Sequence, residues 1–166
     1  MSTEESLAGS LDLPPESAQR IRRGSVAMGI NLIVAAVILG GGSIVEATVG
    51  ISSATPGRSW LVYLGVLPAL LMVVLALAVL GVRRCLDGDR LDLAAVAAIR
   101  SVLRLRWIAA VVTALVVIVV LLLFDFLSGG SAAGSAILGA LPPFLCAVVA
   151  NTSYGAAKSW LNHESD

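Results

Sequence analysis

Long uninterrupted apolar runs dominate the chain and distinguish it from a soluble helical or β-sheet protein. Four runs carry almost no charge, and they cover about 24–45, 59–82, 107–126 and 135–154. A helix needs about 20 mainly apolar residues to cross the roughly 30 Å of hydrocarbon in a bilayer, whereas the strands of a membrane β-barrel are shorter and alternate apolar with polar positions. The pattern therefore predicts an all-α, polytopic membrane protein with four transmembrane helices.

The overall composition agrees with this interpretation. The 166 residues are 58% hydrophobic and 13% charged, and the mean hydropathy is +0.95. Soluble domains carry about 25% charged residues, which cover their surface in water, and disordered chains have few apolar residues. A soluble globular protein and a wholly disordered chain are therefore both excluded.

Basic residues indicate on which side of the membrane each helix end lies. Ten of the eleven Lys and Arg residues precede the first run, separate the second from the third, or follow the fourth, and Arg58 alone lies on the other side. Short loops rich in Lys and Arg stay in the cytoplasm. We therefore expect a multi-pass protein with both termini in the cytoplasm. The abundance of Ala, Val, Leu, Gly and Arg suggests a bacterial chain in the cytoplasmic (inner) membrane.

The segments outside the transmembrane domain at 20–157 are short. Residues 1–19 are polar, contain a pair of prolines and have few large apolar side chains, so we expect a disordered cytoplasmic tail. The alternative is a docking segment that folds on a partner. Residues 158–166 predict a short cytoplasmic C-terminus.

The cytoplasmic loop at 83–106 predicts an amphipathic helix at the membrane interface. Asp89 is a suitable N-cap, because its side chain can accept hydrogen bonds from the free amides of a first helical turn. Apolar residues follow on one face and arginines on another, which favours contact with anionic lipid headgroups. The expected lipid contacts are Arg90, Arg100 and Arg104, and the helix turns into the third run at Trp107. The alternative is that this helix binds in the groove of a partner protein.

The sequence contains no recognisable motif for catalysis or cofactor binding. The acidic run at 87–92 departs from the calcium-loop pattern in the position of its glycine and in lacking a later Glu. Cys85 and Cys146 lie at different predicted depths, and His163 is three residues from the C-terminus. We therefore expect no enzymatic activity, no cofactor, no metal and no nucleic-acid partner.

Polar residues inside or at the ends of the runs are the remaining candidates for a site. Glu46 and Asp125 end the first and third runs, and both are expected near the outer interface, where they could bind a cation or share a proton. The alternative is that both carboxylates lie in headgroup water. Asn31 and Asn151 share an inner depth and could bond between helices, or could line a polar path together with the two acids.

These features predict a non-enzymatic membrane protein that acts through partners. It would be an accessory or assembly subunit of a membrane complex, or a homo-oligomer, in contact with the lipid bilayer. The alternative function is a small proton- or cation-coupled transporter or channel that uses Glu46 and Asp125.

Overall fold

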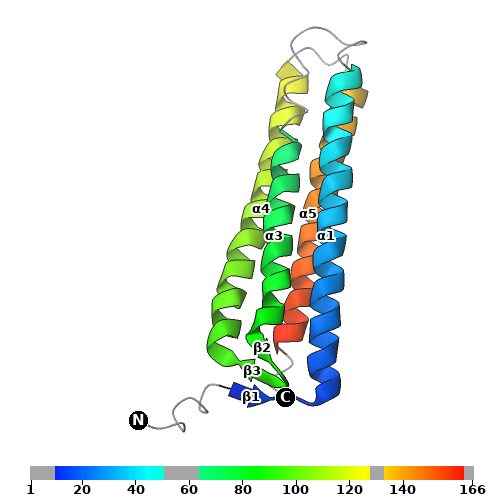
Figure 1. Ribbon diagram of the computed structural model, residues 1–166. Coiled ribbons are helices and arrows are strands. Elements are labelled where there is room, and N and C mark those ends of the chain that lie inside the picture. The colour runs from blue at the N-terminus through cyan, green and yellow to red at the C-terminus, as the bar shows by residue number, and fades with distance from the viewer. Residues whose placement is uncertain (1–9, 51–63, 128–132, 163–166) are drawn as a thin grey trace.

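The computed structural model describes residues 10–50, 64–127 and 133–162. Within these ranges the chain forms long helices and one small sheet at their end (Figure 1). The elements in chain order are β1 (Ser10–Asp12), α1 (Pro15–Gly50), α3 (Val66–Gly81), the 3₁₀ turn η2 (Val82–Cys85), β2 (Leu86–Asp87), β3 (Arg90–Asp92), α4 (Leu93–Leu127) and α5 (Ala133–Asn162).

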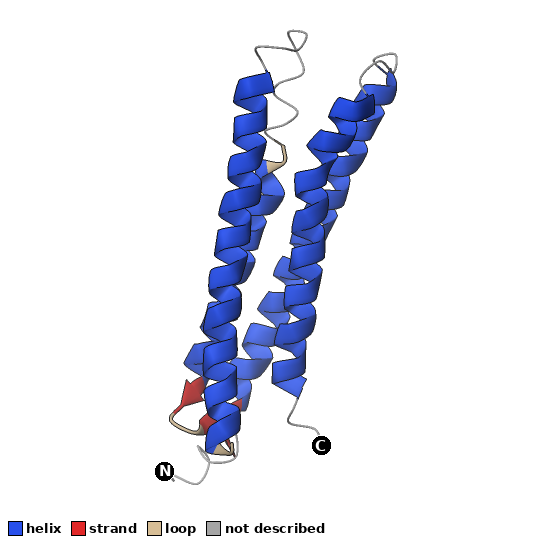
Figure 2. Cartoon of the chain, turned by 90° about the vertical axis from the view of Figure 1, so that its right-hand side faces the viewer, coloured by secondary structure: helices blue, strands red, loops and turns tan. Residues whose placement is uncertain are grey.

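The four described helices lie side by side, with α1 beside α3 and α4 beside α5 (Figure 2). Further contacts join α3 to α4 and α1 to α5, so α1 and α4 lie diagonally opposite and make little contact. The start of α1, the β2–β3 hairpin and the end of α5 lie together at one end, which we call the hairpin end (Figure 1).

Three of the helices are long and apolar enough to cross a membrane, over Pro15–Val45, Val66–Cys85 and Leu93–Leu127. Large apolar side chains are exposed along them: Ile38 is 65% exposed and Val119 is 61% exposed. Lipid tails can cover such a surface, whereas water cannot do so without a large cost in free energy. The expectation of an all-α, membrane-embedded protein is therefore confirmed.

Glycine allows α1 to approach α3 closely. A Cβ atom at Gly29 would lie 2.5 Å from Cγ of Leu80, and one at Gly40 would lie 3.1 Å from Cβ of Ala69. Membrane helices associate through such small residues because two apolar surfaces gain little from hydrophobic burial in lipid. The hydrogen of glycine is thus required at Gly29 by the packing of the two helices.

The helix boundaries differ from the sequence expectation around the cytoplasmic loop. We expected an interfacial helix that turns at Trp107, but α4 runs without interruption from Leu93 to Leu127. Val96, Leu103 and Ala110 are all buried and are spaced by seven residues. This spacing keeps one face of the helix against its neighbours, so the amphipathic segment packs on the protein and continues the membrane helix.

Secondary structure in the N-terminal segment also begins earlier along the chain than expected. Residues 10–12 form β1 and α1 begins at Pro15, within the segment expected to be a disordered tail. Proline suits the first position of a helix because its missing N–H has no partner there in any case. Residues 1–9 of that tail lie outside the described residues, and at the other terminus α5 continues to Asn162.

Candidate functional site

The small sheet at the hairpin end joins the N-terminal segment to the loop between α3 and α4. The strand order is β1-β3-β2, and both pairs are antiparallel. Leu11 pairs with Leu91, which is 2% exposed and also pairs with Leu86. Gly88 has a positive φ of 65° in the turn between β2 and β3, a conformation that favours glycine.

Three polar contacts hold the N-terminal segment to this hairpin. Nη2 of Arg22 donates to the carbonyl oxygen of Gly88 at 2.6 Å. Nε of Arg90 lies 3.1 Å from Oδ1 of Asp12, and the backbone N–H of Leu13 donates to the carbonyl oxygen of Asp89 at 2.9 Å. The segment from Asp12 to the start of α1 is thereby linked to the turn of the hairpin and to the first residue of β3.

Asp92 caps α4, whereas the sequence favoured Asp89. Oδ1 of Asp92 accepts hydrogen bonds from the backbone N–H groups of Ala94 at 2.9 Å and Ala95 at 3.3 Å. Asp89 lies instead in the turn before β3. The prediction of Asp89 as N-cap is wrong because residues 90–92 pair with β1 and are extended, which delays the start of the helix to Leu93.

The contact between α4 and α5 repeats every seven residues along an antiparallel seam. Nη2 of Arg100 donates to the carbonyl oxygen of Leu161 at 2.9 Å. One heptad later, Trp107 stacks on Tyr154 with the ring centroids 4.6 Å apart and an interplanar angle of 13°. Further along the seam, Ala140 of α5 packs against the buried cluster of Val117 and Leu121 on α4. This register places the end of α5 beside the first turns of α4.

Arg106 of α4 forms a hydrogen bond to α3. Its Nη1 donates to the carbonyl oxygen of Val74 at 3.1 Å. Arg100 and Arg106 therefore connect α4 to its two neighbours, α5 and α3.

Two of the three arginines expected to contact lipid are bonded within the protein. Arg90 pairs with Asp12, and Arg100 donates to Leu161. Arg104 is exposed and has no hydrogen-bond or ion-pair partner among the described residues. Sequence reasoning overlooked the roles of Arg90 and Arg100 because their partners lie 78 and 61 residues away along the chain.

The two acidic candidates lie on the helices that make little contact with each other. Glu46 belongs to the last turns of α1, and its side chain lies outside the described residues. Asp125 is half-buried near the end of α4, where it has an interaction partner.

The two asparagines are exposed on the outer surface of their helices. Asn31 lies on α1 and Asn151 on α5, and neither side chain makes a hydrogen bond with another described residue. The described structure therefore does not contain the interhelical hydrogen bonds that we expected from them. Ser25 and Ser43 are buried, but their hydroxyls donate to carbonyl oxygens of their own helix.

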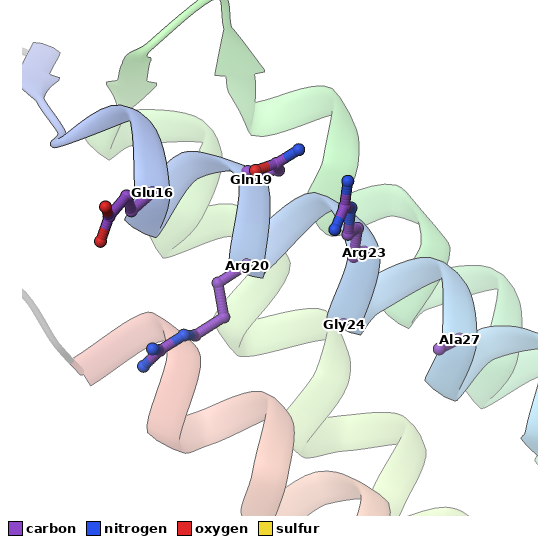
Figure 3. Close-up of a pocket in the computed structure, with 6 residues that line it drawn as sticks. All are labelled: Glu16, Gln19, Arg20, Arg23, Gly24 and Ala27. Carbon is purple, nitrogen blue, oxygen red and sulfur yellow. The ribbon is translucent and has the colours of Figure 1, made fainter.

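A shallow, open groove lies on α1 at the hairpin end (Figure 3). It has a volume of about 490 Å³. We call it the basic groove, and its lining residues are Glu16, Gln19, Arg20, Arg23, Gly24 and Ala27. Arg20 and Arg23 were among the basic residues that indicated the orientation, but they were not predicted as site residues. The available signal was their three-residue spacing, which places both on one face of a helix.

The described part of the chain contains no second candidate site built from metal-binding side chains or thiols. His, Cys, Asp and Glu side chains form no group of three or more there that could hold a metal ion. Cys85 and Cys146 are buried and unpaired with each other. Comparison with known protein families, curated proteins and solved structures finds no match for this chain.

Proposed function

We propose that this chain is a non-enzymatic integral membrane protein that acts through partners, as an accessory or assembly subunit of a membrane complex or as a homo-oligomer. One observation carries the proposal: Arg22, Arg100 and Arg106 each donate to a backbone carbonyl of another element. Three charged side chains of the described structure are thus used to hold the scaffold together.

The proposed topology has four crossings of the bacterial cytoplasmic membrane, with both termini in the cytoplasm. The fourth crossing is assigned to α5, whose 30 residues extend about 45 Å at 1.5 Å per residue. The grouping of the α1 start, the hairpin and the α5 end at one end of the molecule supports an even number of crossings (Figure 1). The basic residues at this end favour the cytoplasm.

Reporter fusions test the topology. We expect fusions after Arg23, within 83–106 and at Asp166 to read as cytoplasmic, and fusions at Ser53 and Gly130 to read as external. An external reading within 83–106 contradicts the proposed orientation.

Purification from native membranes in mild detergent tests the partner-dependent function. The protein mass of the eluting particle is compared with the 17.0 kDa of one chain, and crosslinked species are identified by mass spectrometry. A defined complex or a discrete homo-oligomer supports the proposal. A stable monomer without crosslinked partners contradicts it.

A second candidate function is a small proton- or cation-coupled transporter or channel. The observation in its favour is the half-buried Asp125 near the end of a helix that is apolar enough to span a membrane. A carboxylate in such a place is energetically unfavourable unless it has a function or a partner. Its proposed counterpart is Glu46, and a flux measurement separates this function from the first.

A further inference from the structure

The arginines near the hairpin end divide into two groups according to their partners. Those with partners are Arg22, Arg90, Arg100 and Arg106. The others are exposed and make no hydrogen bond or ion pair within the described residues: Arg20, Arg23, Arg83, Arg84 and Arg104. Of these, Arg20 and Arg23 line the basic groove. Their guanidinium groups are therefore free to bind a ligand from outside this part of the chain.

The basic groove is lined by these two arginines and by two small residues that follow them along α1. Arg20 points toward the end of α5, Arg23 points away from it, and Gly24 and Ala27 come after Arg23 along the helix (Figure 3). Trp160 of α5 limits one flank, since a Cβ at Gly24 would lie 2.9 Å from its ring. Two guanidinium groups and one carboxylate, that of Glu16, line the groove, which favours an anionic ligand.

The surface of α1 changes from basic to apolar directly beyond the groove. Ile30, Val34 and Ile38 are 52%, 49% and 65% exposed and are spaced by four residues, so they follow one side of the helix. We call these three residues the apolar strip. From Ala27 to Ile38 the helix rises about 16 Å, close to the roughly 15 Å thickness of one hydrocarbon leaflet.

We propose that the basic groove binds the phosphate-bearing headgroup of an anionic phospholipid, whose acyl chain lies along the apolar strip. Arg20 supplies a charge-assisted hydrogen bond to a phosphate oxygen from the side of the groove toward α5, and Arg23 supplies one from the other side. The small, exposed side chain of Ala27 leaves room for the headgroup within about 490 Å³. An amphipathic ligand matches both parts of this surface, whereas free phosphate or an acidic peptide matches the groove alone.

Native mass spectrometry of the full chain in detergent tests the proposal. The protein is titrated separately with dioleoyl-phosphatidylglycerol, dioleoyl-phosphatidylcholine and inorganic phosphate, and the dissociation constant of the first adduct is measured. We expect the first phosphatidylglycerol to bind more tightly than phosphatidylcholine, and inorganic phosphate not to compete at equal concentration. Each arginine contributes about five-fold to binding of an anionic lipid, so the double variant Arg20→Gln/Arg23→Gln should weaken the first site about thirty-fold.

The matched control is Arg83→Gln/Arg84→Gln. It removes two exposed arginines from η2, which also lies at the hairpin end, and these have no hydrogen-bond or ion-pair partner among the described residues. We expect this control to change the first dissociation constant by less than two-fold, and Arg20→Lys/Arg23→Lys to retain most of the affinity. Equal losses in both Gln pairs, equal affinity for the two lipids, or displacement by inorganic phosphate would overturn the proposal.

Discussion

The guanidinium group of Arg100 donates to the carbonyl oxygen of Leu161 at 2.9 Å, and this bond joins the first part of α4 to the last turn of α5. The final carbonyl groups of a helix have no partner within the helix, and a basic side chain from another element can satisfy one of them. Seven residues along each helix, Trp107 stacks on Tyr154. These two contacts together fix the antiparallel register of α4 and α5.

Replacing Arg100 with Gln should loosen the end of α5. The substitution removes a charged donor from a helix-terminal carbonyl, and we expect a loss of about 1 kcal/mol in unfolding free energy. Hydrogen exchange should become faster over 157–162. The control is Arg104→Gln, since Arg104 is exposed and has no hydrogen-bond or ion-pair partner among the described residues. Equal exchange rates in the two variants would show that the Arg100 bond does not hold α5.

Two substitutions of Trp107 distinguish the contribution of ring packing to stability from that of a hydrogen bond by the indole. Nε1 of Trp107 is buried and has no hydrogen-bond partner among the described residues, so Trp107→Phe loses no hydrogen bond and should change stability by less than about 1 kcal/mol. Trp107→Ala removes the stack on Tyr154 and should destabilise the protein by about 2 kcal/mol or more. Thermal unfolding in detergent measures both effects.

A double-mutant cycle provides the control for the ring contact. Tyr154→Ala is combined with Trp107→Ala, and we expect a coupling energy of about 1 kcal/mol, the usual value for an aromatic pair. Additive effects would mean that the two rings act independently, and a large loss in Trp107→Phe would point to a hydrogen bond to the indole.

Replacing Gly29 with Ala should disturb the contact between α1 and α3. The new Cβ would lie 2.5 Å from Cγ of Leu80, so the helices must move apart or Leu80 must change rotamer, at about 1–3 kcal/mol. Gly41→Ala is the matched control on the same helix, because a Cβ there meets nothing within 4 Å. Alanine has the higher helix propensity, so this control should be neutral or stabilising. Equal melting temperatures for the two variants would contradict the close approach.

The sequence predicted the elements that depend on local pattern. The apolar runs locate α1, α3, α4 and α5, because a helix that meets lipid must satisfy its backbone within its own residues. The pairing of Asp12 with Arg90 could not be predicted in this way, since it joins segments 78 residues apart. The same pairing extends residues 90–92 and makes Asp92, rather than Asp89, the N-cap.

The candidate site, like the fold, could be predicted from the sequence only where it depends on residues that are close along the chain. A seven-residue repeat of Val96, Leu103 and Ala110 is visible in the sequence, but it is equally compatible with a helix that packs on lipid and one that packs on protein. The contacts of α3 and α5 decide between these possibilities. The partner of each arginine likewise depends on which carbonyl the fold brings near, so Arg100 could not be separated from Arg104 by sequence alone.

A flux measurement separates the two proposed functions. The purified protein is reconstituted in liposomes, and proton and cation fluxes are followed between pH 5 and pH 8. We expect the parent protein to be indistinguishable from empty liposomes, because the proposed function depends on partners and the helices that carry the two acids, α1 and α4, make little contact with each other within the described residues. Reproducible flux by the parent protein would favour the transporter or channel.

The variants Glu46→Gln and Asp125→Asn show whether any such flux depends on the acids. An amide keeps the approximate shape of the carboxylate and removes its charge, so a coupling site that binds a cation or a proton loses its function while the protein still assembles. Flux abolished by each substitution, with unchanged assembly, would assign the transport role to these two residues. Flux that survives both would remove Glu46 and Asp125 from the pathway.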